Sequence, residues 1–236
     1  MSRGLWGRIE MSEGPARLRT GGAAVADVVD RLDAGEAPST LAGRLGIEPA
    51  DVVAAVAFDA LGEGEGPPLV QSPPRRPRLA GALAAGSLAG LYPSVPGPLV
   101  LALSAGLLQV HDFWGASHAA AQAADDQGER SVSAYWHGIG HRREPDPGNA
   151  AYWFRRVGRH PVFTPLAAAV REVLSAPGGD PAMTDRLLPR GSWDPLAFID
   201  ICSAARGDDA ARARRVQCRE MRLLLEITHG GMPIGS

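Results

Sequence analysis

The sequence predicts an all-α protein, in which a small helix-turn-helix module, with room for a short β-hairpin, precedes an all-helical domain of about seven helices. Apolar residues recur at helical spacing in most segments of the 236-residue chain. After residue 25 no useful stretch alternates apolar and polar residues, which is the pattern of a half-buried strand. Turns rich in glycine and proline separate the helical segments, and this combination indicates helices packed on helices.

The composition allows an ordinary core and limits the partners. A formal net charge of -2 gives no overall attraction to nucleic acid or to anionic lipid. The N-terminal residues lack the apolar stretch of a signal peptide, and the most apolar run, residues 98–110, is too short to span a bilayer. Cys202 and Cys218 lie far apart without a CxxC pair. We therefore expect a cytoplasmic protein with reduced cysteines and no membrane contact.

Residues 1–62 are expected to form the small module. Gly21-Gly22 predicts a turn between two short extended pieces. Apolar side chains then fall on one face in three successive short helices, the last of them over residues 50–61. Gly46 turns the chain before this third helix, and the resulting order is typical of a helix-turn-helix.

Residues 63–78 are rich in glycine and proline and predict a stiff linker. The all-helical domain should follow over residues 79–236. Its helices are expected at residues 79–91, 99–124, 131–144, 150–159, 165–174, 193–205 and 209–228.

Proline separates the third and fourth of these helices, because Pro145 and Pro147 cannot continue the first of the two. Ser131 or Ser133 is expected to cap the third helix, and Asn149 the fourth. The two helices and their turn hold an unusual share of the histidine, tryptophan and arginine residues, so we expect any functional site to lie here.

The histidines near this turn have the spacing of a metal site. His137, His141 and Glu144 stand at i, i+4 and i+7 and so share one helix face. His118 lies on the preceding helix, and a short connection favours contact between the two helices. Three imidazoles suit zinc or iron, so His118, His137 and His141 are the predicted ligands of a divalent metal ion. The alternative is that these histidines bridge helices by hydrogen bonds or face solvent.

Two carboxylates are the candidate catalytic groups. Glu220 falls on the apolar stripe of the last helix, together with leucine and valine residues. A buried carboxylate needs an arginine or a metal ion as its partner, so we expect Glu220 to be buried and paired. Either Glu144 or Glu220 could be a fourth ligand or a general base.

Four arginines around the turn, with aromatic and histidine neighbours, form the expected binding surface for a small anion. The expected binding residues are Arg142, Arg143, Arg155, Arg156, His160, Trp136 and Trp153. The alternative is that the arginines pair with Glu144 and Asp146 across the turn, and that the tryptophans belong to the core.

Residues 25–60, VADVVDRLDAGEAPSTLAGRLGIEPADVVAAVAFDA, resemble the small bacterial domain-of-unknown-function family 433. The resemblance implies an antitoxin-like helix-turn-helix and makes DNA a candidate partner through residues 25–61. The chain departs from the family in that residues 19–22 carry only part of its Gly-Thr-Arg element. The third helix also carries Asp51 and Asp59, where a helix that meets phosphates normally brings arginine or lysine.

The rest of the chain has a second resemblance, which covers most of residues 98–228. It resembles an uncharacterised helical family found mainly in planctomycete-type bacterial genomes, and implies a shared fold without an assigned activity. The segments that carry it are HDFWGASHAAAQAADD (111–126), AYWHGIGHRREPD (134–146) and NAAYWFRRVGRHPVF (149–163).

Two hypotheses of function follow from these residues. The first is a metal-assisted enzyme that acts on a small anionic substrate through a His/Glu/Arg pocket. The second is a non-enzymatic helical scaffold or regulatory protein that binds a protein or nucleic-acid partner through its helix-turn-helix module and its arginine-rich surface. Metal analysis of the purified protein separates the two.

Overall fold

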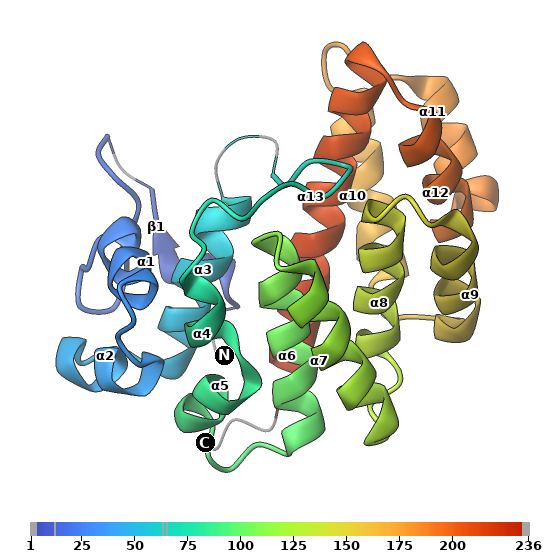
Figure 1. The fold of residues 1–236 in the computed structure, drawn as a ribbon. Coiled ribbons are helices and arrows are strands. Elements are labelled where there is room, and N and C mark those ends of the chain that lie inside the picture. The colour runs from blue at the N-terminus through green and yellow to red at the C-terminus, as the bar shows by residue number, and fades with distance from the viewer. Residues whose placement is uncertain (1–3, 12, 63, 65, 233–236) are drawn as a thin grey trace.

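The computed structural model describes residues 4–11, 13–62, 64 and 66–232, and it confirms the all-α class with a short hairpin (Figure 1). The hairpin pairs β1 (Ile9–Glu10) with β2 (Arg17–Leu18) in antiparallel register. Two short 3-10 helices are η1 (Trp6–Arg8) and η2 (Pro189–Gly191). The α-helices are α1 (Val25–Asp33), α2 (Pro38–Leu45), α3 (Pro49–Leu61), α4 (Leu79–Leu83), α5 (Ala85–Leu91), α6 (Gly97–Val110), α7 (Trp114–Asp126), α8 (Val132–Arg143), α9 (Pro147–Val157), α10 (Phe163–Ser175), α11 (Pro181–Leu187), α12 (Pro195–Ala204) and α13 (Gly207–Gly230).

Ten α-helices, α4 to α13, follow residue 78 in the described part of the chain, compared with the prediction of about seven. The expected helix over residues 79–91 is interrupted at Ala84, whose extended backbone separates α4 from α5. The expected helix over residues 99–124 is interrupted at Asp112, which adopts the left-handed conformation with φ 66°. The short helix α11 lies in a segment for which the sequence predicts no helix.

The helices pack around one continuous hydrophobic core that extends from the N-terminal hairpin to the end of α13. Helices α6, α7, α8 and α9 lie side by side in chain order, and α13 crosses behind α6 and α8 (Figure 1). The last helix therefore contacts elements from both ends of the sequence, including α3, α6, α10 and α12.

Helix α3 is the central helix of the N-terminal part. All its residues from Ala50 to Ala57 are buried, and it packs against α1, α6 and α13. Asp51 is bound by Arg8 at 2.9 Å. A recognition helix needs an exposed face to enter a DNA groove, and α3 does not present one in this arrangement. DNA contact through residues 25–61 stays a prediction. Within this segment, such contact would have to use the exposed faces of α1 and α2.

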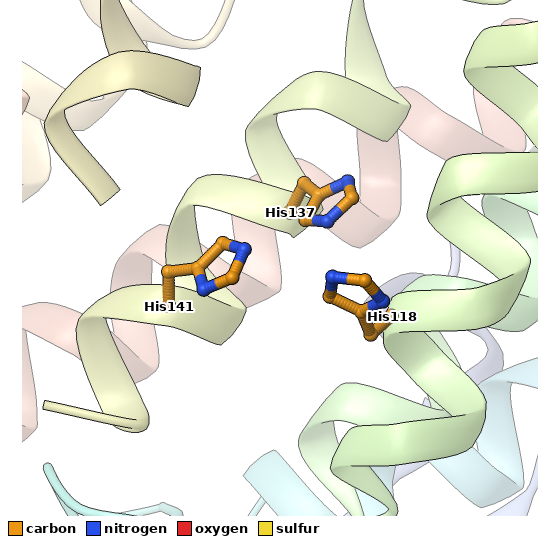
Figure 2. Close-up of side chains that lie close together, drawn as sticks. All are labelled: His118, His137 and His141. Carbon is orange, nitrogen blue, oxygen red and sulfur yellow. The ribbon is translucent and has the colours of Figure 1, made fainter. Parts of the chain in front are cut away.

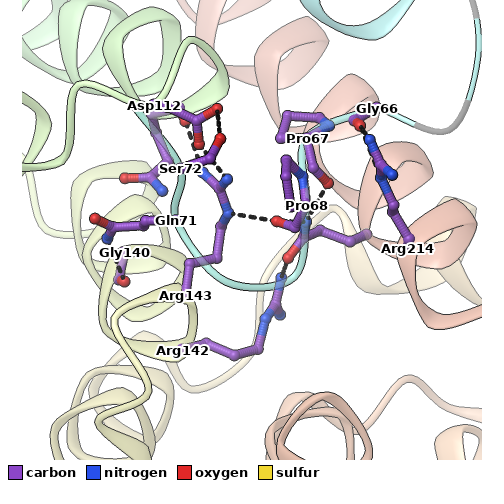
Figure 3. A network of polar contacts seen from close by, with 12 residues as sticks. Gly66, Pro67, Pro68, Gln71, Ser72, Asp112, Gly140, Arg142, Arg143 and Arg214 are labelled. Carbon is purple, nitrogen blue, oxygen red and sulfur yellow. Dashed lines mark hydrogen bonds and ion pairs between the residues drawn. The ribbon is translucent and has the colours of Figure 1, made fainter. Parts of the chain in front are cut away.

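The proline-rich segment over residues 66–78 is hydrogen-bonded to the helices beside it (Figure 3). The side-chain amide of Gln217 donates to the Pro68 carbonyl at 3.1 Å, and the backbone amide of Gln71 donates to the Arg143 carbonyl at 3.0 Å. The division of the chain into module, linker and helical domain stays a prediction, and limited proteolysis tests it because an accessible linker is cut first.

None of the described helices combines the length and the apolar character needed to cross a membrane. Cys202 and Cys218 are both buried, and neither forms a disulfide bond.

Candidate metal centre

The connection between α7 and α8 places the expected metal ligands on neighbouring helices. Glu129 caps α8, because its carboxylate accepts hydrogen bonds from the backbone amides of Val132 at 3.2 Å and Ser133 at 2.7 Å. Ser131 occupies the N-cap position of α8, as predicted, but the carboxylate of Glu129 rather than a serine hydroxyl accepts the capping hydrogen bonds. The Ser131 side chain makes no capping bond, and the Ser133 hydroxyl donates to the Glu129 carbonyl instead.

The three predicted metal ligands converge between α7 and α8 (Figure 2). The ring centres of His118 and His137 are 4.3 Å apart, and the ring of His141 lies 5.3 Å from His118 and 5.2 Å from His137. One nitrogen from each ring lies within 4.8 Å of the others. Because ligand nitrogens about 2.0–2.1 Å from one ion lie closer together than this, only small side-chain shifts separate the grouping from ligation. The group is geometrically able to hold a metal ion.

His137 is the most informative member of the group. It is 2% exposed, and neither of its ring nitrogens has a hydrogen-bond partner among the described residues. A buried polar group without a partner is costly, and it calls for an explanation such as a bound ion. Burial, followed by the charges of His118 and His141, lowers the pKa of His137 to about 3. The imidazole is therefore neutral near pH 7, which is the form that binds a metal ion.

His141 is oriented by a carboxylate. Its Nδ1 lies 3.0 Å from Glu144 Oε2, so an Nδ1–H donates to the carboxylate and Nε2 is left as the lone-pair donor. A carboxylate bonded to the second nitrogen of a metal-binding histidine is the usual arrangement around metal ions. His118 is half-buried, and burial, with the nearby His141, lowers its pKa. Glu144 thus orients His141, one of the three residues that could hold a metal ion.

Two further residues lie near the histidine group. The ring of Trp114 lies 5.3 Å from the ring of His118 and one turn earlier on the same helix. Gln109 is 1% exposed, and neither atom of its side-chain amide has a hydrogen-bond partner among the described residues. This amide lies beside Gly140, which precedes His141 on α8. No sequence pattern indicated Gln109, because it belongs to an apolar helix.

The two predicted binding tryptophans have different places. Trp153 stacks on the His137 ring with 3.9 Å between ring centres and an 11° angle, so it forms one wall of the histidine group. Trp136 is fully buried, and its indole N–H donates to the Thr228 hydroxyl at 3.2 Å. Trp136 is therefore a core residue, and its assignment to a binding surface is wrong.

A second set of possible ligand atoms, from His141, Glu144 and Asp146, lies beside the first. Asp146 is already engaged as the cap of α9, since its carboxylate accepts from the backbone amide of Asn149 at 3.0 Å and from its side-chain amide at 2.8 Å. These hydrogen bonds lower the pKa of Asp146. The prediction that Asn149 caps this helix is wrong, because α9 begins two residues earlier, at Pro147.

Glu220 is fully buried and paired, as predicted. Its carboxylate accepts from Arg142 Nη1 at 3.1 Å, from Arg142 Nη2 at 2.5 Å and from the Tyr135 hydroxyl at 2.9 Å. The Tyr135 oxygen in turn accepts from the Trp193 indole at 3.1 Å. Glu220 is not among the ligand atoms grouped with the histidines, so the structure does not support a role for it as ligand or base.

Arg142 and Arg143 belong to an internal network of polar contacts (Figure 3), in which Arg142 pairs with Glu220 and Arg143 pairs with Asp112. Both side chains are completely shielded from solvent. Arg143 is bonded to the Asp112 carboxylate, and it donates to the Pro68 carbonyl at 3.0 Å and to the Gln109 carbonyl at 2.9 Å. Neither arginine is available to an external anion, and neither pairs across the turn.

The remaining predicted binding residues lie on or near α9. Arg156 pairs with Asp125 on α7 at 2.8 Å, whereas Arg155 is exposed. His160 is buried against the Tyr135 ring, and burial lowers its pKa to about 4. His160 is thus a core histidine, and the structure does not bring it to the metal group.

Comparison of the chain with protein-family models, with curated proteins and with solved structures finds no match. The assignment of the site therefore depends on the geometry of the residues described above.

Proposed function

We propose that this protein binds a divalent transition metal ion through His118, His137 and His141 and uses it in a metal-assisted reaction on a small substrate. The observation that carries the proposal is the buried His137 ring, which has no hydrogen-bond partner in the described part of the chain and lies beside two further imidazoles.

The composition of the group favours zinc, with iron as the second candidate. Imidazole nitrogen binds both metals, but non-haem iron sites typically include a carboxylate ligand. Here the nearest carboxylate, Glu144, is bonded to His141 and orients it. Zinc held by three protein ligands keeps a position for water or substrate, which is the arrangement of catalytic rather than structural zinc sites.

The surrounding residues have distinct roles in this proposal. When bound, the ion would polarise a carbonyl or phosphoryl oxygen, or lower the pKa of a water molecule. Trp153 covers one face of the His137 ring, and His118, the most exposed of the three histidines, is the ligand that a substrate would meet first. The internal pairing of Arg142 and Arg143 means that these two residues do not select an anionic substrate.

Two observations weigh against the scaffold hypothesis. Two of the four arginines that it invokes, Arg142 and Arg143, are internal, and the α3 helix that would read DNA is buried. A gel-shift titration at several salt concentrations tests the remaining DNA hypothesis, since phosphate contacts weaken steeply as salt rises.

The test of the metal proposal uses the full chain, with metal content measured by mass spectrometry and cobalt(II) binding followed by visible absorption. We expect about one metal ion per chain, and loss of binding in His137→Ala. The matched control is His160→Gln, which alters another buried histidine with an unpartnered nitrogen outside the group.

If His137→Ala and the control bind metal equally, the site assignment fails. Enzymatic use of the metal is tested separately with chromogenic esters, for which turnover should follow metal occupancy. If the protein binds one metal ion per chain but shows no metal-dependent turnover, the metal centre would be structural rather than catalytic.

A further inference from the structure

Three arginines share one face of α13. Arg215, Arg219 and Arg222 stand at i, i+4 and i+7, so their side chains lie one above the other. The opposite face of the helix is buried and carries Gln217 and Leu224. Like charges at this spacing repel one another, and the arrangement is destabilising unless a negative group joins it.

These arginines line a cavity of about 340 Å³ where the end of α3, α10 and α13 meet. Leu61, Val173 and Cys218 give the cavity an apolar part. The one carboxylate among the described residues that line it is Glu172. Its lining thus joins three positive charges and one negative charge to an apolar patch.

The internal pairing does not neutralise the cluster. Arg219 Nη2 lies 3.3 Å from Glu172 Oε1, but the glutamate side chain is 71% exposed, so solvent screens this pair. The guanidinium groups of Arg215 and Arg222 have no hydrogen bond or ion pair with any residue in the described part of the chain. Within the described residues, two of the three positive charges thus have no counter-charge.

Arg222 is held in place by an aromatic ring. Its guanidinium carbon lies 4.2 Å from the centre of the Trp6 ring, which supports the planar group without using its N–H donors. Burial, together with the positive charge of Arg219, lowers the pKa of Arg222. An anion in the cavity would offset both effects.

We propose that this cavity is a binding site for a small phosphate monoester. Guanidinium groups bind phosphate through paired N–H donors, and three of them can share the oxygens of one doubly charged group. The apolar part formed by Leu61, Val173 and Cys218 would take the organic portion of the ester. The site is independent of the histidine group, because it lies on the face of α13 opposite the one that receives Arg142.

The experiment is a calorimetric titration of the full chain with inorganic phosphate, phenyl phosphate and citrate. We expect saturable binding with phenyl phosphate tighter than phosphate, because the apolar part contributes, and citrate weaker than both. Arg222→Gln and Arg215→Gln should each weaken phenyl phosphate binding about ten- to a hundred-fold, as expected for a lost charged hydrogen bond. Arg186→Gln is the matched control, since Arg186 is an exposed arginine on α11.

Glu172→Gln provides a variant in the opposite direction. It should tighten phosphate binding several-fold, because Arg219 loses its competing carboxylate. The proposal is overturned by the absence of saturable binding, by equal losses in the cavity variants and the control, by weaker binding in Glu172→Gln, or by citrate that binds as tightly as phenyl phosphate. None of these results depends on metal, so the two proposals fail separately.

Discussion

Replacing Glu220 with leucine should remove the centre of a buried polar network. Both members of the Arg142–Glu220 pair have side chains fully shielded from solvent. In Glu220→Leu, the Arg142 guanidinium keeps only the Gln217 side-chain oxygen at 3.3 Å as a hydrogen-bond acceptor. The Tyr135 hydroxyl loses its acceptor as well, although it still accepts from the Trp193 indole.

The size of the effect follows from these losses. An unpaired buried charge costs about 3–5 kcal/mol of folding free energy. An unsatisfied buried hydroxyl donor at Tyr135 adds about 1 kcal/mol. We therefore expect Glu220→Leu to lower the free energy of unfolding by about 4–6 kcal/mol, a large fraction of the total for a protein of this size.

Urea unfolding followed by circular dichroism at pH 7 measures this loss. The double variant Arg142→Met/Glu220→Leu removes both charges and should recover most of the stability, to within about 1–2 kcal/mol of the unchanged protein. A single variant within about 1 kcal/mol of the unchanged protein would refute the argument. So would a double variant that is no more stable than the single one.

Two further perturbations test the core. Gly106→Ala should lower the free energy of unfolding by about 1–3 kcal/mol, because the new Cβ would lie 2.7 Å from the buried Trp136 ring. Gly115→Ala, on the exposed side of α7, should leave the stability unchanged or raise it slightly. Thermal unfolding of both variants tests this difference. Burial lowers the pKa of His229 to about 4, so the folded protein favours its neutral form. The stability from this preference is complete above the unfolded pKa of about 6.5, and it falls by roughly 1.4 kcal/mol per pH unit until the pH reaches the folded pKa of about 4. Urea midpoints at pH 7 and pH 4.5 should therefore differ less for His229→Gln than for the unchanged protein, and equal differences would contradict the assignment.

The sequence was informative where one helix determines the outcome. Spacing alone predicted that His137 and His141 share a face, and the apolar stripe around Glu220 predicted its burial. Both follow from the helical repeat and need no knowledge of the partner. The approach of His118 from the neighbouring helix depended only on the short connection between two consecutive helices.

The sequence was uninformative where residues distant in the chain meet. Arg142 was expected to bind an anion and Glu220 to need a cation, yet no pattern indicated that the two, 78 positions apart, bind each other. The sequence also did not predict the helix break at Asp112. At this break the Asp112 carboxylate pairs with Arg143, which is distant in the sequence. The arginine face of α13 was visible in the spacing, but its cavity is formed by helices from other parts of the chain.

The adjacent arginines at the end of α8 have a practical consequence for work with shorter versions of the protein. Arg143 donates to the carbonyl of Pro68, and Gln217 donates to the same carbonyl, so two interior side chains of the helical part rely on a residue that precedes it. In a fragment that begins at Leu79, both side chains would lose this hydrogen-bond acceptor, and the interior around them would be exposed to solvent. The end of the helix that carries His137 and His141 would lose one of its anchors, and a failure of such a fragment to bind metal would reflect this damage rather than the chemistry of the histidines.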